Sequence, residues 1–143
     1  MAAHRTKTKL EAAICREMDR QGVAHAHRVL SYRVRMKSGR TAAFQPAIVA
    51  HCGPILFLVE PCLSYTPGGG AVQRHERFLD QHSAELVLIL VAPATVAARL
   101  PHGSYDELYE DTELEKLVSR IRDQDPHGAV AHFEKRKRVR AGS

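Results

Sequence analysis

Apolar side chains recur with a helical period at the start of the chain and with a strand period after it. The helical spacing covers residues 6–21, where Thr6 or Thr8 can cap the first turn and Gly22 is suited to end the last one. Residues 29–36 then alternate between polar and apolar side chains. The pattern therefore predicts a helix followed by a strand with one buried face.

Two longer apolar segments follow this strand. Residues 43–51 and 55–62 are predicted to be strands, and the Cys-Gly-Pro sequence at 52–54 is a tight turn between them. Residues 37–40, Lys-Ser-Gly-Arg, have the composition of a second hairpin turn, which joins the first strand to this pair. Because turns of hairpin length join them, we expect the three strands to be antiparallel neighbours.

The second half of the chain alternates helices with a strand. The Thr-Pro-Gly-Gly-Gly sequence at 66–70 is a breaker loop before a predicted helix at 71–82. Residues 85–92 are an uninterrupted apolar run, typical of a strand buried on both faces, which should pair in parallel after the helical crossover. The remaining expected elements are a short helix at 95–100, a short element at 105–109 and a helix at 112–123 capped by Thr112.

This order of elements predicts a single α/β domain with a central mixed four-stranded sheet, flanking helices and a C-terminal helix. The length of 143 residues suits one domain. We place it at residues 1–133 and expect residues 134–143 to be a basic, disordered tail.

The net charge of +5 is concentrated at the two ends of the chain. Basic ends can bind nucleic acid through phosphates, or they can be solvated segments that aid solubility. Three widely spaced cysteines without a CxxC pair indicate reduced thiols. No apolar run approaches the ~20 residues that span a bilayer, and no secretory signal begins the chain, so we expect a cytoplasmic protein without a membrane partner.

One carboxylate stands near the end of the strand predicted at 55–62. Glu60 follows Ile-Leu-Phe-Leu-Val and precedes Pro61 and Cys62. With the order of helix, three strands, helix and strand, this position resembles the PD-(D/E)xK nuclease superfamily over roughly residues 10–100. The resemblance implies a restriction-endonuclease-like αβββαβ core. In that family carboxylates hold one or two Mg²⁺ ions, which polarise a phosphate and activate water.

The residues at the motif positions depart from the motif. The resemblance places Glu11 at the helical Glu of the family and Glu60 at the Glu of Glu-x-Lys. It also implies that Ala47, in Gln-Pro-Ala, replaces the metal-binding Asp and that Cys62 replaces the Lys. This implies a degenerate site of Glu11, Ala47, Glu60 and Cys62 with no cofactor. Glu11 and Glu60 would hold Mg²⁺ or Mn²⁺ only if the site is active.

Each of these residues also has an ordinary structural interpretation. Glu60 could face water at a strand end or pair with a nearby Arg, because charges are seldom buried alone. Glu11 could lie on an exposed helix face, where Glu is favoured. Cys62 could be a small packed hydrophobe.

Candidate phosphate-binding side chains lie on the first predicted strand and its turn, on the helix at 71–82 and in the tail. They are Arg33, Arg35, Lys37, Arg40, Arg74, Arg77, Lys135, Arg136, Lys137 and Arg138. The alternative for this set is an ordinary solvated surface.

Candidate zinc ligands are His25, His27, His51 and Cys52. The His-x-His spacing puts both rings on one face of a strand. No second pair stands at a standard spacing, which favours surface histidines.

Three functional hypotheses follow. The preferred one is a catalytically degenerate PD-(D/E)xK-like domain that binds nucleic acid without cleaving it. The second is an active Mg²⁺- or Mn²⁺-dependent DNA nuclease with a rearranged site, to which Glu76 or His51 would contribute. The third is a non-enzymatic homodimeric interaction module.

Overall fold

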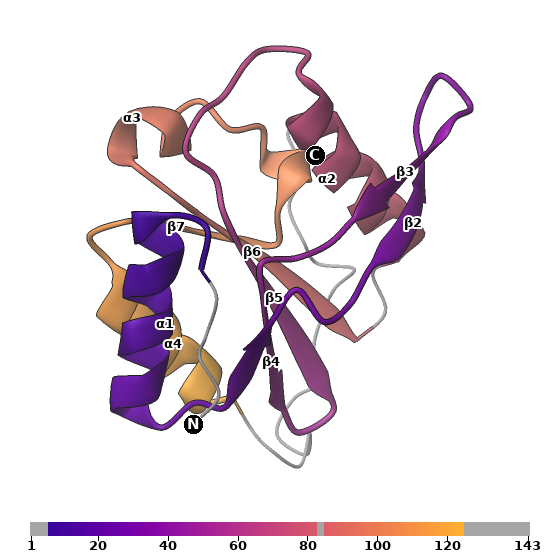
Figure 1. Ribbon diagram of the computed structural model, residues 1–143. Helices are drawn as coiled ribbons and strands as arrows, with labels where there is room; N and C mark the ends of the chain where they lie inside the picture. Colours follow the sequence, from indigo (N-terminus) through magenta and orange to yellow (C-terminus); the bar gives the residue numbers. More distant parts are fainter. Residues whose placement is uncertain (1–5, 83–84, 125–143) are drawn as a thin grey trace.

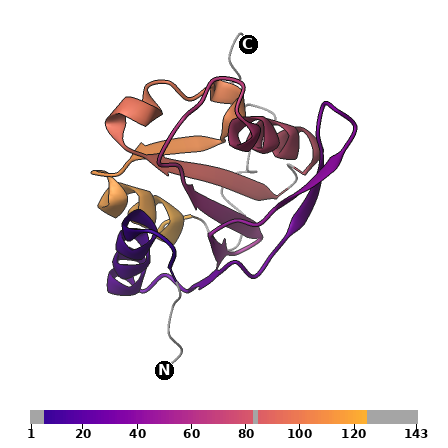
Figure 2. The same cartoon turned by 45° about the horizontal axis from the view of Figure 1, so that its top comes forward.

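A five-stranded mixed sheet with helices on both faces forms the centre of the molecule (Figures 1 and 2). The computed structural model describes residues 6–82 and 85–124. The strand order in the sheet is β1-β4-β5-β6-β7. The helices of the molecule are α1 (Lys9–Gln21), α2 (Gly70–Gln81), α3 (Ala94–Ala97) and α4 (Leu114–Arg122), with a 3-10 turn at His102–Ser104. The strands of the central sheet are β1 (His25–His27), β4 (Ile48–Cys52), β5 (Ile55–Pro61), β6 (Leu86–Ala92) and β7 (Glu107–Glu110).

The first helix forms as the sequence predicts. The Thr8 side chain accepts a hydrogen bond from the backbone N–H of Glu11 at 3.0 Å and caps the first turn. Gly22 takes a left-handed conformation with φ of 74° and ends the helix. One face of α1 packs through Ile14 and Met18 against the sheet, and α4 packs beside it.

The central strands also follow the prediction. β4 and β5 form an antiparallel hairpin, and β6 pairs in parallel with β5 after the crossover through α2. Residues 87–92 are buried because β6 has α1 and α4 over one face of the sheet and α2 over the other. The apolar run at 85–92 thus has the buried position that its composition indicates.

The first predicted strand lies outside the central sheet. β2 (Tyr32–Arg35) and β3 (Thr41–Phe44) form a separate two-stranded hairpin, which packs on α2 and extends away from the sheet in Figure 1. The strand predicted at 43–51 is divided between β3 and β4, because the segment at 45–47 contains Pro46 and changes direction. The expectation of three antiparallel neighbours in one sheet was therefore wrong.

Two short strands complete the sheet. β1 takes the edge position beside β4, and β7 pairs in parallel with β6 at the opposite edge. The described sheet accordingly has five strands instead of the four expected. The last helix begins at Leu114 with Glu113 as its N-cap residue, so the predicted cap by Thr112 was also wrong.

The expected fold class is nevertheless observed: a mixed α/β domain with a central sheet flanked by helices. The order of α1, the β4–β5 hairpin, α2 and parallel β6 matches the restriction-endonuclease-like arrangement that the resemblance implies. The expected tail at 134–143 lies outside the described residues. Within those residues, no helix combines the length and apolar character needed to cross a membrane.

Candidate functional site

The register of the central hairpin places Ala47 beside Glu60. Ile48 pairs with Val59, so the residue before β4 lies opposite Glu60 near the end of β5. The backbone N–H of Ala47 donates a hydrogen bond to Oε1 of Glu60 at 2.8 Å. The carboxylate therefore points back toward the segment where the family motif would place a second acid.

Glu11 is buried and surrounded by donors. Its residue exposure is 1%, so it is not the solvent-facing helix residue that its helical position could have suggested. Arg28 binds both carboxylate oxygens, with Nη1 at 2.9 Å from Oε2 and Nη2 on Oε1. His27 Nδ1 lies 2.7 Å from Oε2, and the backbone N–H of Lys7 donates to Oε1 at 3.1 Å.

Arg28 joins the helical acid to the Gln-Pro-Ala segment. Its φ of 52° is left-handed, which is uncommon outside glycine. Its backbone N–H donates to the carbonyl of Ala47 at 3.1 Å, and the Gln45 side-chain amide donates to its carbonyl at 3.2 Å. These contacts hold the backbone in a conformation from which the guanidinium reaches Glu11.

Glu11, Arg28, Ala47 and Glu60 line one pocket of about 230 Å³, which we call the acid pocket. Its other lining residues are Lys7, Thr8, Pro61 and Leu63. The structure thus brings together three of the four positions at which the resemblance implies a site. It also adds a cation that the sequence analysis did not select.

The two carboxylates of the acid pocket have opposite pKa shifts. Burial raises the pKa of Glu60 to about 7, although the Ala47 N–H and the charges of Arg28 and Arg74 act in the other direction. Burial also acts to raise the pKa of Glu11, but the hydrogen bonds from Arg28, Lys7 and His27 outweigh it and hold that pKa below its ordinary value. Glu11 is therefore ionised, and Glu60 changes its charge near neutrality.

Cys62 contributes no charge to the acid pocket. Its residue is buried in the apolar cluster under α2, and its thiol donates a weak hydrogen bond to the carbonyl of Ser64 at 3.5 Å. Burial, followed by the charge of Glu60, raises the pKa of the Cys62 thiol. It cannot supply the ammonium of the motif Lys.

The residues of the acid pocket do not fit Mg²⁺ or Mn²⁺. These ions need several oxygen ligands, but both oxygens of Glu11 already accept hydrogen bonds from a guanidinium and Ala47 has no ligand atom. His51 cannot complete the set, because it pairs with Leu56 near the other end of the β4–β5 hairpin. Glu76 is not among the lining residues of the pocket.

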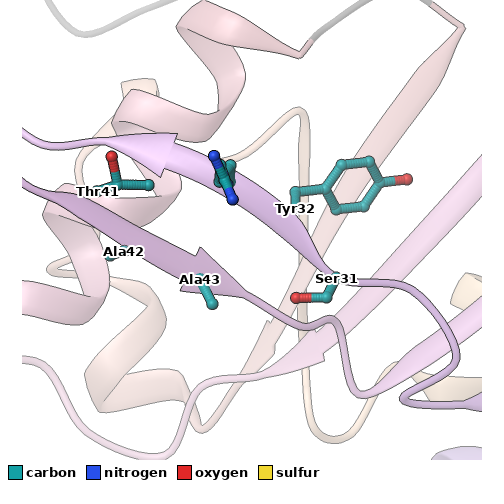
Figure 3. A pocket seen from close by; sticks show the side chains of 6 residues that line it. Ser31, Tyr32, Thr41, Ala42 and Ala43 are labelled. Carbon is teal, nitrogen blue, oxygen red and sulfur yellow. The ribbon is translucent and has the colours of Figure 1, made fainter.

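The predicted basic residues of the first strand gather on the exposed hairpin. Arg33 and Arg35 in β2, and Lys37 and Arg40 in its turn, are all exposed. Val34 and Phe44 fill the opposite face of the hairpin and pack under α2. Figure 3 shows the strand surface around Ser31, Thr41 and Ala43, where a shallow pocket of about 460 Å³ includes Arg33.

The helix arginines serve other contacts. Arg77 donates through Nε to the carbonyl of Arg35 at 2.9 Å and so fixes β2 to α2. Arg74 is half-buried, and its charge acts on Glu60. The predicted residues Lys135, Arg136, Lys137 and Arg138 lie outside the described part of the chain.

Sequence reasoning missed Arg28 as a site residue. It follows His-x-His in a polar connector, and nothing in its neighbours marks it as the partner of an acid 17 positions earlier. Only the folded chain, in which the residue after β1 lies beside the first turn of α1, brings the guanidinium to Glu11.

We predict that the stability effect of Glu60→Gln depends on pH. Because the folded-state pKa of about 7 lies above the ordinary value of 4.5, the native state loses stability as pH rises from about 4.5 to 7. Glu60→Gln cannot ionise, so it lacks this loss. The difference in free energy of unfolding, variant minus native chain, should therefore increase by up to about 3 kcal/mol between pH 4.5 and pH 8.

Urea unfolding at the two pH values measures this difference. Glu115→Gln is the matched control, because its side chain is 80% exposed and should show a much smaller pH dependence. An effect of Glu60→Gln that is the same at both pH values would contradict the assigned pKa shift.

Comparisons with known proteins give two distant structural neighbours. No protein-family model and no curated protein matches the chain. Protein VC1899 from Vibrio cholerae aligns with 79% of this chain at 16% identity and a TM-score of 0.46, and this chain covers 32% of its length. The small subunit of the heterodimeric restriction endonuclease R.BspD6I aligns with 78% of this chain at 13% identity and a TM-score of 0.44, with 67% of its own length covered. The fold assignment accordingly rests on the observed element order and sheet topology.

Proposed function

We propose that this chain is a nuclease-like domain that binds nucleic acid through its exposed hairpin and does not cleave it at the acid pocket. The observation that carries the proposal is the pairing of the Arg28 guanidinium with both oxygens of Glu11, the acid that the resemblance assigns to the metal site. The proposal extends the resemblance that the element order and Glu60 suggest.

The pairing of Arg28 with Glu11 supports the proposal that the acid pocket does not cleave nucleic acid with a metal ion. Arg28 already provides the buried Glu11 carboxylate with a bidentate cation, which is a strong and geometrically specific pairing. A metal ion would have to displace this guanidinium and leave it buried beside another cation. The raised pKa of Glu60 further weakens the pocket as a metal ligand set, because only the ionised carboxylate binds well.

The hairpin offers the best surface for phosphates. Arg33, Arg35, Lys37 and Arg40 are exposed, and none of them forms an ion pair with a carboxylate within residues 6–82 and 85–124. Gln81 and Arg77 bind the backbone of Arg35, so α2 holds the strand that carries two of these cations. Such an arrangement favours sequence-independent binding.

We predict that removing the four hairpin cations weakens binding to duplex DNA. The Arg33→Ala, Arg35→Ala, Lys37→Ala and Arg40→Ala substitutions, combined, should lower affinity at least tenfold near physiological salt. If each cation neutralises one phosphate, the slope of log affinity against log salt should fall in magnitude by about 3 to 4. Fluorescence anisotropy over a salt series measures both quantities.

The control removes the same charge from another surface. Arg16, Arg20, Lys116 and Arg122 are exposed on α1 and α4, and their combined replacement by Ala should change affinity much less. Equal losses in the two variants would show that net charge alone governs binding. Absence of binding by the native chain near physiological salt would also contradict the proposal.

We predict that the native chain leaves supercoiled plasmid intact in the presence of Mg²⁺ or Mn²⁺. The reason is that Ala47 supplies no ligand and Arg28 holds Glu11. Gel electrophoresis of the plasmid measures nicking and linearisation. Cleavage by the native chain that Glu60→Ala abolishes would favour the rearranged active nuclease instead.

The homodimeric interaction module stays a separate prediction. Light scattering of the full chain measures its mass in solution, with and without DNA.

A further inference from the structure

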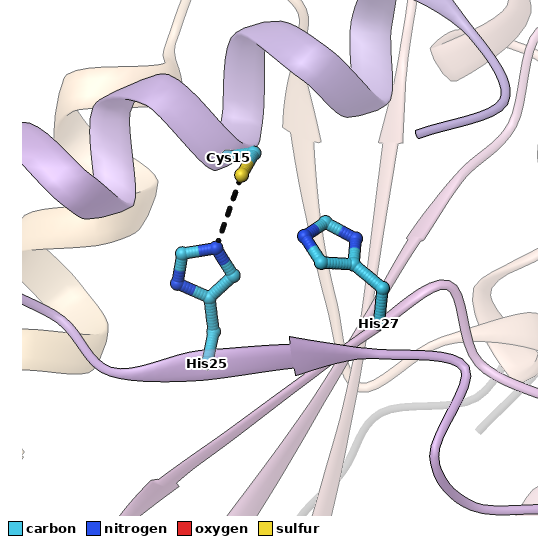
Figure 4. Close-up of side chains that lie close together, drawn as sticks. All are labelled: Cys15, His25 and His27. Atoms are coloured by element: carbon cyan, nitrogen blue, oxygen red, sulfur yellow. Dashed lines mark hydrogen bonds between the residues drawn. The ribbon is translucent and has the colours of Figure 1, made fainter. Parts of the chain in front are cut away.

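A second group of potential ligands lies between α1 and β1. Cys15 projects from α1 toward the rings of His25 and His27, which rise from the same side of β1 (Figure 4). One ligand atom from each residue lies within 4.8 Å of the other two. His25 and His27 are partly exposed on the edge strand β1, and Cys15 is 6% exposed.

The hydrogen bonds of the two rings fix which nitrogen can bind a metal. His25 Nδ1 lies 2.9 Å from the carbonyl oxygen of Val23, and His27 Nδ1 lies 2.7 Å from the carboxylate of Glu11. Because these oxygens only accept, each Nδ1 carries the proton. In the neutral ring, Nε2 then has the lone pair, and this carboxylate or carbonyl support is usual behind metal-binding histidines.

The distances are close to those of a tetrahedral centre. Cys15 Sγ lies 3.2 Å from His25 Nε2. With Zn–N of about 2.0–2.1 Å and Zn–S of about 2.3 Å, two ligand atoms of a tetrahedron lie roughly 3.3–3.6 Å apart. Small side-chain rotations would therefore bring all three ligand atoms to one ion.

We propose that Cys15, His25 and His27 form a Zn²⁺ site, to which residues 6–82 and 85–124 contribute these three ligands. A thiolate with two imidazoles selects Zn²⁺ over Mg²⁺ and Mn²⁺, which prefer oxygen. On binding, the Cys15 thiol loses its proton to solvent and the Zn–S bond forms, with no change of oxidation state. The site is distinct from the acid pocket, although Glu11 accepts hydrogen bonds both from His27 of this site and from Arg28 of the acid pocket.

Co²⁺ titration of the full chain tests this site, because tetrahedral Co²⁺ bound to a thiolate absorbs in the near ultraviolet and visible range. The native chain should develop the thiolate charge-transfer band and saturate at one equivalent. Zn²⁺ should displace Co²⁺ and raise the thermal unfolding midpoint, whereas Mg²⁺ in excess should do neither.

Cys15→Ser is the diagnostic variant, because Ser retains a hydroxyl that can donate to His25 while it removes the sulfur ligand. It should lose the charge-transfer band with an unchanged far-ultraviolet circular dichroism spectrum. Cys52→Ala, at a half-buried thiol bonded to the carbonyl of Gln124, should retain the band. No band in the native chain, or a band that survives in Cys15→Ser, would overturn the proposal and leave these contacts with a packing role.

Discussion

The buried Glu11 carboxylate needs hydrogen-bond donors and positive charge from the protein, because water does not reach it. An ionised carboxylate with 1% exposure is strongly destabilising unless donors and a cation surround it. Arg28, His27 and the Lys7 backbone satisfy this requirement from two elements. They tie the start of α1 to the residue after β1, where the contacts with Ala47 and Gln45 hold the left-handed backbone of Arg28.

The same contacts hold the acid pocket together. The hairpin register brings Ala47 and Glu60 together on its other side, where the Ala47 N–H donates to the Glu60 carboxylate. Because the Arg28 guanidinium pairs with both oxygens of Glu11, the buried charge of this carboxylate is compensated within the acid pocket. The exposed cations of the β2–β3 hairpin lie on a different element, which Arg77 of α2 holds through the backbone of Arg35.

The sequence was most informative where a local rule dominates. Thr8 and Gly22 bound a helix through capping, and the continuous apolar run of β6 is typical of a strand buried on both faces. The sequence could not show that β2 and β3 form a hairpin apart from the central sheet, because polar and apolar residues alternate in β2 as they would in a strand of that sheet. β1 is three residues of His-Ala-His, and only its pairing with β4 makes it a strand. Arg28 escaped notice because its role depends on contacts between distant segments.

A double-mutant cycle between Glu11 and Arg28 measures the interaction on which the acid pocket depends. The free energies of unfolding of the native chain, Glu11→Gln, Arg28→Met and the double variant give the coupling between the two side chains. We expect a coupling of about 2 kcal/mol or more, as for a desolvated pair, and the same value with Mg²⁺ present. A coupling below about 0.5 kcal/mol, in the range of exposed ion pairs, would contradict the assignment of Arg28 as the cation of the acid pocket.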